Sequence, residues 1–187
     1  MQEKIIYRRA SREDASLVAR VVSLALGEDV TQRYCGKNAI EVLETIARAT
    51  DTQYSYINVI VAEINGSGVG AIIGYDGAML QSLRSCTLDI IKQISGVCPY
   101  VEDETTAGEF YLDSIAVLPE WQGFGIGARL IELMRDEAFA DGFNRVGLLV
   151  DFVNQRAEAL YERLGFRRVN PTTLLGHKLW HMQAMKE

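Results

Sequence analysis

The sequence EFYLDSIAVLPEWQGFGIG, residues 109–127, decides the fold of this chain. Its first half is rich in aromatic and β-branched residues and predicts a strand, which Pro119 ends because proline has no N–H to give to a neighbouring strand. Three glycines follow, at positions 123, 125 and 127, and apolar residues recur at helical spacing from Leu130. A strand, a glycine-rich turn and a helix present backbone N–H groups and a helix dipole to an anion. The stretch therefore predicts a phosphate-binding site.

Two blocks of this sequence resemble a known family. Residues 122–127, QGFGIG, fit the Gln/Arg-x-x-Gly-x-Gly/Ala loop of the GCN5-related N-acetyltransferases, the GNAT superfamily, and residues 115–119 look like the strand that leads into this loop. A second block matches the family's downstream pattern Asn-x-x-Ala-x-x-x-Tyr-x-x-x-Gly-Phe through Asn154, Ala157, Tyr161, Gly165 and Phe166. The blocks follow each other in the family's order and spacing and cover roughly the C-terminal 40 per cent of the chain.

This resemblance implies both a fold and a reaction. The fold would be an α/β domain with a mixed, twisted β-sheet, helices on both faces and a splayed central pair of strands. The reaction would be direct transfer of an acetyl group from acetyl-coenzyme A (acetyl-CoA) to a primary amine, most plainly that of a small molecule, with no metal and no covalent enzyme intermediate. Two alternatives stay open, namely a non-catalytic acyl-CoA-binding regulatory domain and an acetyltransferase for protein N-termini or lysines.

The resemblance also assigns coenzyme-binding residues. The edge formed by Ile115, Ala116 and Val117 would pair with the pantetheine arm as an added strand does, and a β-bulge is a plausible way to open that edge. Asn154 would orient the arm, or would only cap the helix that follows it. The pyrophosphate would meet the backbone of the loop residues Gln122, Gly123, Phe124, Gly125, Ile126, Gly127 and Ala128.

Acyl transfer to an amine needs a general base for the ammonium group and a general acid for the departing thiolate. Tyr161 matches the family's general acid, although a tyrosine here could also be a core residue. Asp113 is the first candidate for the base and Glu109 the second, since both lie on one face of the predicted strand; water could replace either of them. An acidic acceptor site for a cationic amine is a hypothesis that rests on Glu102, Asp103, Glu104, Glu109 and Asp113.

Composition limits the other possibilities. A chain of 187 residues with 48% hydrophobic residues is typical of one globular domain, so we expect residues 1–187 to form a single domain. The net charge of −6 argues against a nucleic-acid partner. The three cysteines form no Cys-x-x-Cys pair, and His177 and His181 lack a third metal ligand. No membrane span or signal peptide is predicted, so we expect a cytoplasmic protein, with a homodimer possible.

Periodicity predicts the remaining elements. We expect strands at 5–8, 56–64, 69–75 and 145–150, one or two closing strands at 166–169 and 174–185, and helices at 11–27, 37–49, 126–142 and 154–165. Residues 76–108 form an apparent insertion, with a helix near 80–94 and an acidic loop at 101–106. The insertion could be a lid or a wall of the acceptor site, or simply a packing helix or dimer contact.

Overall fold

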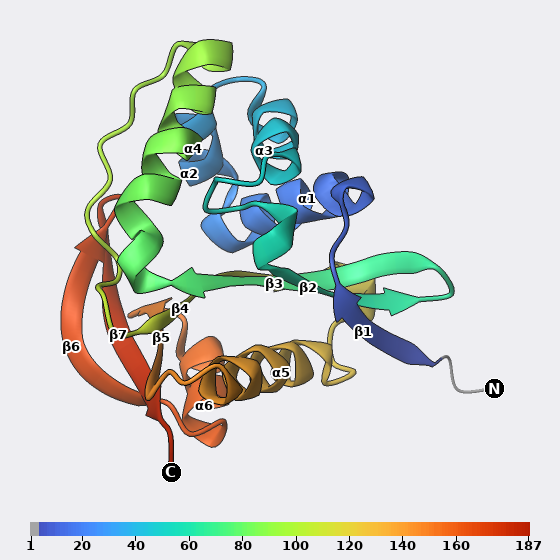
Figure 1. Ribbon diagram of the computed structural model, residues 1–187, viewed down its shortest axis with the longest axis vertical. Helices are drawn as coiled ribbons and strands as arrows, with labels where there is room; N and C mark the ends of the chain where they lie inside the picture. Colours follow the sequence, from blue (N-terminus) through green and yellow to red (C-terminus); the bar gives the residue numbers. More distant parts are fainter. Residues whose placement is uncertain (1–3) are drawn as a thin grey trace.

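A seven-stranded β-sheet forms the centre of the computed structural model, which describes residues 4–187 (Figure 1). The strand order is β1–β2–β3–β4–β5–β7–β6, and all neighbours are antiparallel except β4 and β5, which run parallel. The sheet is therefore mixed, as the sequence predicts. The strands are β1 (Ile5–Arg9), β2 (Val59–Ile64), β3 (Ser67–Asp76), β4 (Phe110–Val117), β5 (Arg145–Asp151), β6 (Arg167–Leu174) and β7 (His177–Met185).

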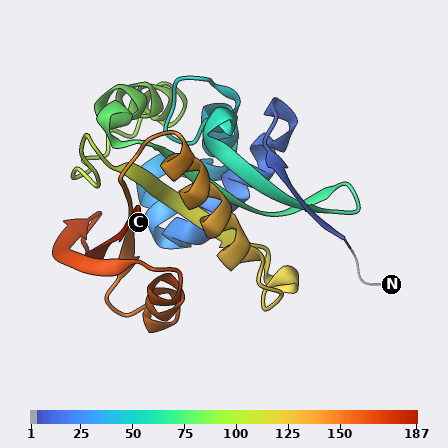
Figure 2. The ribbon, with the colours of Figure 1, turned by 60° about the horizontal axis from the view of Figure 1, so that its bottom comes forward.

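Helices cover both faces of this sheet (Figures 1 and 2). Along β3, Ala71 and Ile73 join the buried cluster under α1 and α3, whereas Ile72 joins the cluster under α5, because successive side chains of a strand point to opposite faces. The predicted fold class is thus confirmed. One face carries α1 (Ala15–Leu26), α2 (Glu28–Cys35), α3 (Ala39–Arg48) and α4 (Leu80–Ser95), and the other carries α5 (Ile126–Ala140) and α6 (Gln155–Arg163).

The structure differs from the predicted elements in three places, one missed helix and two strand boundaries. Helix α2 was missed because it is short and mostly polar, although Val30 and Tyr34 bury its inner face. Residues 56–58 form a 3₁₀ turn rather than the start of a strand. Strand β6 continues through Pro171, which is tolerated because β6 lies at the edge of the sheet and needs no further donor there.

The apparent insertion at residues 76–108 contains the predicted helix, α4. This helix lies beside α3, and Leu80 and Leu83 pack against Tyr75 of β3 and Tyr111 of β4. It is a packing helix in this structure. Whether it also makes a homodimer contact stays a prediction. The chain then returns through an extended segment, residues 96–109, which passes along the end of the β6–β7 hairpin.

Candidate active site

The sheet opens between its two parallel strands. β4 and β5 pair only at Phe110, Tyr111 and Leu112, after which β4 continues to Val117 without a partner on the β5 side. The pairing of β4 with β3 shifts between Ile73 and Gly74, so Asp113 is the extra residue of a β-bulge. The predicted splay and bulge are therefore both present, and Asp113 is the first residue of β4 beyond the last pair with β5.

A cleft of about 530 Å³, which we call the central cleft, lies along this opening. Every coenzyme-binding residue predicted from the sequence lines it except Phe124, whose side chain is 67% exposed and packs against Trp121. The lining comprises Leu24, Ile115, Ala116, Val117, Trp121, Gln122, Gly123, Gly125, Ile126, Gly127, Ala128, Ile131, Asn154, Arg156, Ala157, Leu160, Tyr161 and Arg163.

One end of the central cleft is suited to an anion. Gly125 precedes α5 with φ 79°, a left-handed conformation that favours glycine, and a Cβ there would meet no atom within 4 Å. The first turn of α5 leaves N–H groups without intrahelical partners, and the helix dipole adds positive charge. Arg156 and Arg163 of the α6 segment also line the cleft. Sequence reasoning missed both arginines, although Arg156 lies inside the second family block.

Gln122 and Asn154 hold the loops beside the cleft. The Gln122 amide donates a hydrogen bond to the Val117 carbonyl at 3.0 Å, which ties the glycine-rich loop to the end of β4. The Asn154 side chain accepts a hydrogen bond from the Ala157 N–H at 3.1 Å and so caps α6. Asn154 also lines the cleft, so a contact with a ligand is compatible with its capping role.

Tyr161 of α6 reaches the cleft from a buried position. Its side chain is 9% exposed and packs edge-on against Phe166, with ring centroids 6.1 Å apart. Burial raises the pKa of the Tyr161 phenol to about 12, and within residues 4–187 no hydrogen bond to its hydroxyl is formed. A phenol in this setting stays protonated at neutral pH and keeps its O–H available as a donor.

On the other face of the sheet, the Asp113 carboxylate belongs to a buried polar group. Its oxygens accept hydrogen bonds from the Tyr75 hydroxyl at 2.9 Å and the Ser114 hydroxyl at 2.8 Å. Burial is the main cause of the raised pKa of Asp113, which makes it a stronger base than an exposed aspartate when it is ionised.

Glu104 from the extended segment completes this group. The Tyr75 hydroxyl lies 3.1 Å from Glu104 Oε1, which also accepts from Gln53 at 2.8 Å and lies 3.2 Å from Arg84. Burial, followed by the charge of Asp113, raises the pKa of Glu104 to about 7. We call Asp113, Glu104, Tyr75, Gln53 and Arg84 the acidic cluster.

Glu109, the second candidate for the base, lies at the closed end of the β4–β5 pair. Its carboxylate is 2% exposed and contacts Thr105, His181 and Gln183, with Thr105 donating at 2.8 Å and the His181 ring nitrogen at 2.9 Å. Despite the opposing effect of burial, these hydrogen bonds lower the pKa of Glu109. A fully bonded, weakly basic carboxylate away from the opening is suited to a structural role.

The hypothesis of a five-residue acidic acceptor site needs a correction. Glu102 accepts a hydrogen bond from the Leu175 N–H at 3.0 Å, and Asp103 pairs with Arg84 at 2.7 Å while 60% exposed. Glu102, Asp103 and Glu109 thus bind other parts of the protein and do not form an acceptor site. Of the five, only Asp113 lies at the opening, and Glu104 is joined to it through the Tyr75 hydroxyl.

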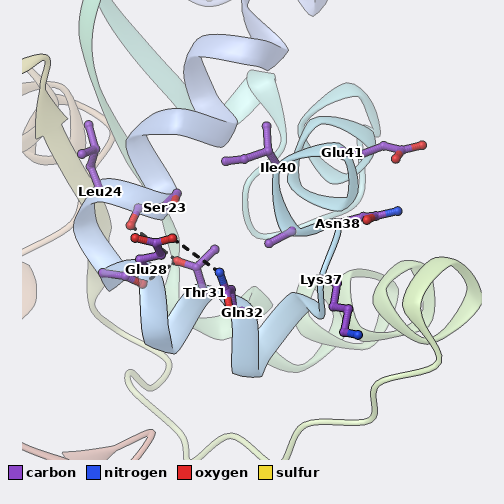
Figure 3. Close-up of a pocket in the computed structure, with 11 residues that line it drawn as sticks. Ser23, Leu24, Glu28, Thr31, Gln32, Lys37, Asn38, Ile40 and Glu41 are labelled. Atoms are coloured by element: carbon purple, nitrogen blue, oxygen red, sulfur yellow. Dashed lines mark hydrogen bonds between the residues drawn. The ribbon is translucent and has the colours of Figure 1, made fainter.

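A second hollow of similar volume, about 530 Å³, lies between α1, α2 and the start of α3 (Figure 3). Its polar side chains bond locally: the Thr31 hydroxyl donates to the Gly27 carbonyl at 2.8 Å, and Gln32 lies 3.5 Å from Glu28. Neither Tyr161 nor a residue of the β4–β5 opening lines it. Leu24 is the residue it shares with the central cleft. We therefore place the candidate active site at the central cleft.

Within residues 4–187, no three His, Cys, Asp or Glu side chains come together in a way that could hold a metal ion. The helices in the same range are all too short or too polar to cross a membrane. His177 and His181 lie on β7, where each contacts a carboxylate, Asp151 and Glu109 respectively.

Comparisons with known proteins agree with this geometry. A sequence model described as "Acetyltransferase (GNAT) family" matches residues 59–166, more than half of the chain. Mycothiol acetyltransferase of Kocuria rhizophila is 36% identical over 89 residues, 48% of this chain and 25% of that protein. Thialysine N-epsilon-acetyltransferase of Sus scrofa is 33% identical over 72 residues, 38% of this chain and 42% of that protein. The matched segments thus span less than half the length of both curated relatives.

The fold is similar over nearly the whole chain. A crystal structure of an acetyltransferase superposes with a TM-score of 0.82 and 29% identity, and the match covers 97% of this chain and 100% of the other. The glycine-rich loop, the β4–β5 opening and the second block around Tyr161 all fall within the matched residues 59–166. The chain therefore belongs to the GNAT acetyltransferase family, whose enzymes use acetyl-CoA as acyl donor.

Proposed function

We propose that this protein transfers the acetyl group of acetyl-CoA directly to the primary amine of a small molecule. The observation that carries the proposal is that the β4–β5 opening has a phenol on one face of the sheet and a carboxylate on the other. A buried phenol, Tyr161, lines the central cleft, and a carboxylate of raised pKa, Asp113, lies at the first unpaired residue of β4. These are the acid and the base that acyl transfer to an ammonium group requires.

The central cleft has the features that the coenzyme needs. The N-terminus of α5 offers unpaired N–H groups to the pyrophosphate, and Arg156 and Arg163 add positive charge nearby. The open edge of β4 at Ile115 and Val117 can pair with the amides of the pantetheine arm as a neighbouring strand would. A volume of about 530 Å³ lies within the range of ligand pockets, roughly 300–1,000 Å³.

The chain's own residues then divide the proton transfers. Asp113 accepts a proton from the acceptor ammonium, and the neutral amine attacks the thioester carbonyl, which a backbone N–H in the opening polarises. Tyr161 donates its phenolic proton to the sulfur as the C–S bond breaks, and it recovers a proton from the nitrogen of the new amide. Among the described residues that line the cleft, none is Cys35, Cys86 or Cys98. This supports direct transfer, without an acetyl-cysteine intermediate.

The acceptor is proposed to enter from the face opposite the cleft. A hollow of about 380 Å³ lies there between α2, residues 99–102 and the β6–β7 turn. Tyr34 lines this hollow and is close enough to Glu104 and Asp113 for their charges to raise its pKa, after the larger effect of burial. The limited volume favours a small amine, and both curated relatives are named for small molecules, mycothiol and thialysine.

Calorimetry and a thiol-release assay test this proposal. Acetyl-CoA is titrated into the protein, and free thiol is then measured across a panel of small amines and of peptides with free N-termini or lysines. We expect amine-dependent thiol release that falls about 100-fold in Tyr161→Phe, with coenzyme affinity preserved. The partly exposed Tyr56, changed to phenylalanine, is the matched control.

Each other outcome selects an alternative. Binding without turnover on any amine would favour a non-catalytic acyl-CoA-binding domain. Turnover on peptides but not on small amines would favour a protein acetyltransferase. No binding of acetyl-CoA would contradict the proposed role of the central cleft.

A further inference from the structure

Two carboxylates in the acidic cluster share one phenol. The Tyr75 hydroxyl lies 2.9 Å from Asp113 Oδ2 and 3.1 Å from Glu104 Oε1. A phenol has a single proton, so Tyr75 can donate to only one of the two carboxylates at a time. Both short contacts can be hydrogen bonds at the same time only if one carboxyl group is protonated and donates its O–H to the Tyr75 oxygen. The geometry is therefore that of a chain able to hold one additional proton.

Neighbouring side chains hold the hydrogen-bonded chain of Asp113, Tyr75 and Glu104 in place. The Gln53 amide donates both to the Tyr75 oxygen at 3.0 Å and to Glu104 Oε1 at 2.8 Å, which holds these two oxygens at hydrogen-bonding distance. Arg84, a cation from α4, contacts Glu104. The other titratable groups that face the pair are Tyr34 of α2, Tyr54 of the loop before β2, Tyr111 of β4, and Asp103 and Glu109 of the extended segment.

Burial makes a single shared proton favourable near neutral pH. Glu104 is 9% exposed, and desolvation together with the neighbouring Asp113 charge raises its pKa to about 7. The pKa of Asp113 is also raised, mainly by burial. Two carboxylates joined through one hydroxyl in a buried site resist being ionised together, so the first ionises well before the second.

The Glu104 end of this hydrogen-bonded chain reaches the surface. Glu104 lines a further hollow, also of about 380 Å³ but separate from the one beside Tyr34, together with Asp103, Thr105, Arg145 and His181. This hollow lies at the outer side of the sheet, between the extended segment and strands β5 to β7. The chain Asp113, Tyr75, Glu104 therefore connects the β4–β5 opening with a solvent-facing hollow distinct from the central cleft.

We propose that Tyr75 and Glu104 form a proton relay, which carries the proton removed from the acceptor ammonium away from Asp113 to this surface hollow. The inference rests on the proposed acetyltransferase function. An N–H bond of the ammonium breaks as Asp113 gains the proton. The Asp113 O–H bond then breaks as Tyr75 accepts that proton and gives its own to ionised Glu104. Asp113 is ionised again, Glu104 is neutral, and the negative charge has moved from Glu104 to Asp113. The Glu104 O–H bond then breaks as a water molecule of the hollow takes the proton, and rotation of the Tyr75 O–H back toward Asp113 restores the starting state.

The relay assigns a role to the apparent insertion. Glu104 and Arg84 both come from residues 76–108, whereas Tyr75 and Asp113 come from the central strands β3 and β4. The insertion would thus contribute the terminal group of the relay and the cation that stabilises its ionised form, and so would be neither a lid nor merely a packing element.

Kinetics of three variants against pH test the relay. Wild type is expected to show a rise of kcat with pH near pH 7, where Glu104 becomes ionised. In Glu104→Gln and Tyr75→Phe, we expect the plateau of kcat to fall about tenfold, because Asp113 would exchange its proton alone. The rise should move to lower pH in Glu104→Gln, where Asp113 loses a neighbouring negative charge, but to higher pH in Tyr75→Phe, where Asp113 loses a hydrogen bond that lowers its pKa. KM for the amine and the affinity for acetyl-CoA should stay within about twofold, since neither residue is proposed to touch a substrate.

Asp103→Asn is the matched control. Asp103 neighbours Glu104 in the chain and contacts the same Arg84, but it makes no contact with Tyr75. Its variant should keep both the plateau and the pH of the rise. A purely structural cluster would instead lower thermal stability and coenzyme affinity in all three variants without moving the pH profile.

The outcomes separate the relay from the function on which it rests. A wild-type protein that acetylates no amine overturns the proposed function. A wild-type protein that does so, but whose Glu104→Gln and Tyr75→Phe variants keep its kcat profile, overturns the relay alone. If Glu104→Gln fails to bind acetyl-CoA, Tyr75→Phe decides, because it keeps the packed ring and removes one oxygen.

Discussion

The central cleft and the acidic cluster meet at the β4–β5 opening, but they are built in different ways. Two continuous stretches, residues 115–131 and 154–163, provide the lining of the cleft apart from Leu24. The acidic cluster draws its members from the loop before β2, from β3, α4, the extended segment and β4, and Gln53 and Glu104 are 51 residues apart. The central cleft is therefore built mainly from contacts between residues close in sequence, and the acidic cluster from contacts between residues far apart in sequence.

The difference matters for chemistry. The cleft would hold an anion largely through backbone N–H groups and a helix dipole, which depend weakly on side-chain identity once the glycines are present. The acidic cluster depends on individual buried charges, each of which changes the pKa of its neighbours. Coenzyme binding should therefore tolerate substitutions in the cluster, whereas proton transfer should not. The following experiments test this separation, from the largest expected effect to the smallest.

Asp113→Asn should separate the two regions most strongly. Removal of the proposed base should lower kcat about 100-fold, while the acetyl-CoA dissociation constant changes less than about twofold. Glu109→Gln is the comparison, since Glu109 occupies the same strand face but is bonded at the closed end. That variant should lose thermal stability and keep kcat within a few-fold. The reverse pattern in steady-state kinetics would exchange the roles of the two carboxylates.

The stability of the protein should reveal the cost of ionising Glu104. Its pKa is raised to about 7 in the folded protein, so the folded state binds a proton that the unfolded state releases near pH 4.5. Glu104 ionisation therefore lowers the stability of the folded state by roughly 3 kcal/mol as pH rises from about 4.5 to about 7.

The measurement is urea unfolding of wild type and Glu104→Gln at several pH values. The free energy of unfolding of the variant should rise relative to that of wild type over this interval, and the difference should be constant above about pH 8. A difference that does not depend on pH would show that Glu104 is not buried in an acid form.

Gly125→Val should act on the central cleft alone. The residue has φ 79°, and a side chain there would extend into the space before the N-terminus of α5. We expect the acetyl-CoA dissociation constant to rise about tenfold by calorimetry, through strain in the turn and loss of access to the N–H groups. Gly142→Val is the control, because Gly142 also has a positive φ, 97°, and free space, but lies beyond the other end of α5. Equal weakening in both variants would point to a general loss of structure.

Arg156→Gln and Arg163→Gln should each have the smallest effect. Both side chains are exposed at the rim of the cleft, so the loss of either should weaken coenzyme binding by about two- to fivefold. The effect should shrink at high salt, because exposed charges are screened. Arg20→Gln on α1, which is exposed and does not line the cleft, should show no change in either buffer. A salt-independent loss would indicate a direct hydrogen bond instead.

Much of the central cleft could be predicted because its signals are local. Glycines at 123 and 125 are required by positive φ values, and the spacing from Asn154 to Tyr161 places the cap and the phenol on one short helix. Arg156 and Arg163 were missed because an exposed arginine on a helix usually has no ligand. Helix α2 was missed because its polarity hides a narrow buried face.

The candidate bases show where sequence reasoning fails. Strand alternation correctly places Glu109 and Asp113 on one face. It does not show that β4 is paired with β5 next to Glu109 but has no partner on that side from Asp113 onward. The bulge that separates their environments arises from the pairing of β4 with β3. Five acidic residues close in sequence therefore end in different contacts.

The sequence by itself determined the glycine-rich turn before α5 and the short helix that carries Tyr161, because short-range backbone preferences and periodicity encode them. The mixed α/β fold followed from the resemblance of two sequence blocks to a known family. Only the tertiary structure decided which carboxylate lies at the opening and what charge it carries. The pKa of Asp113 or Glu104 depends on burial and on partners from distant segments, such as Tyr75 and Arg84. Such long-range contacts leave no pattern in the order of residues along a single chain.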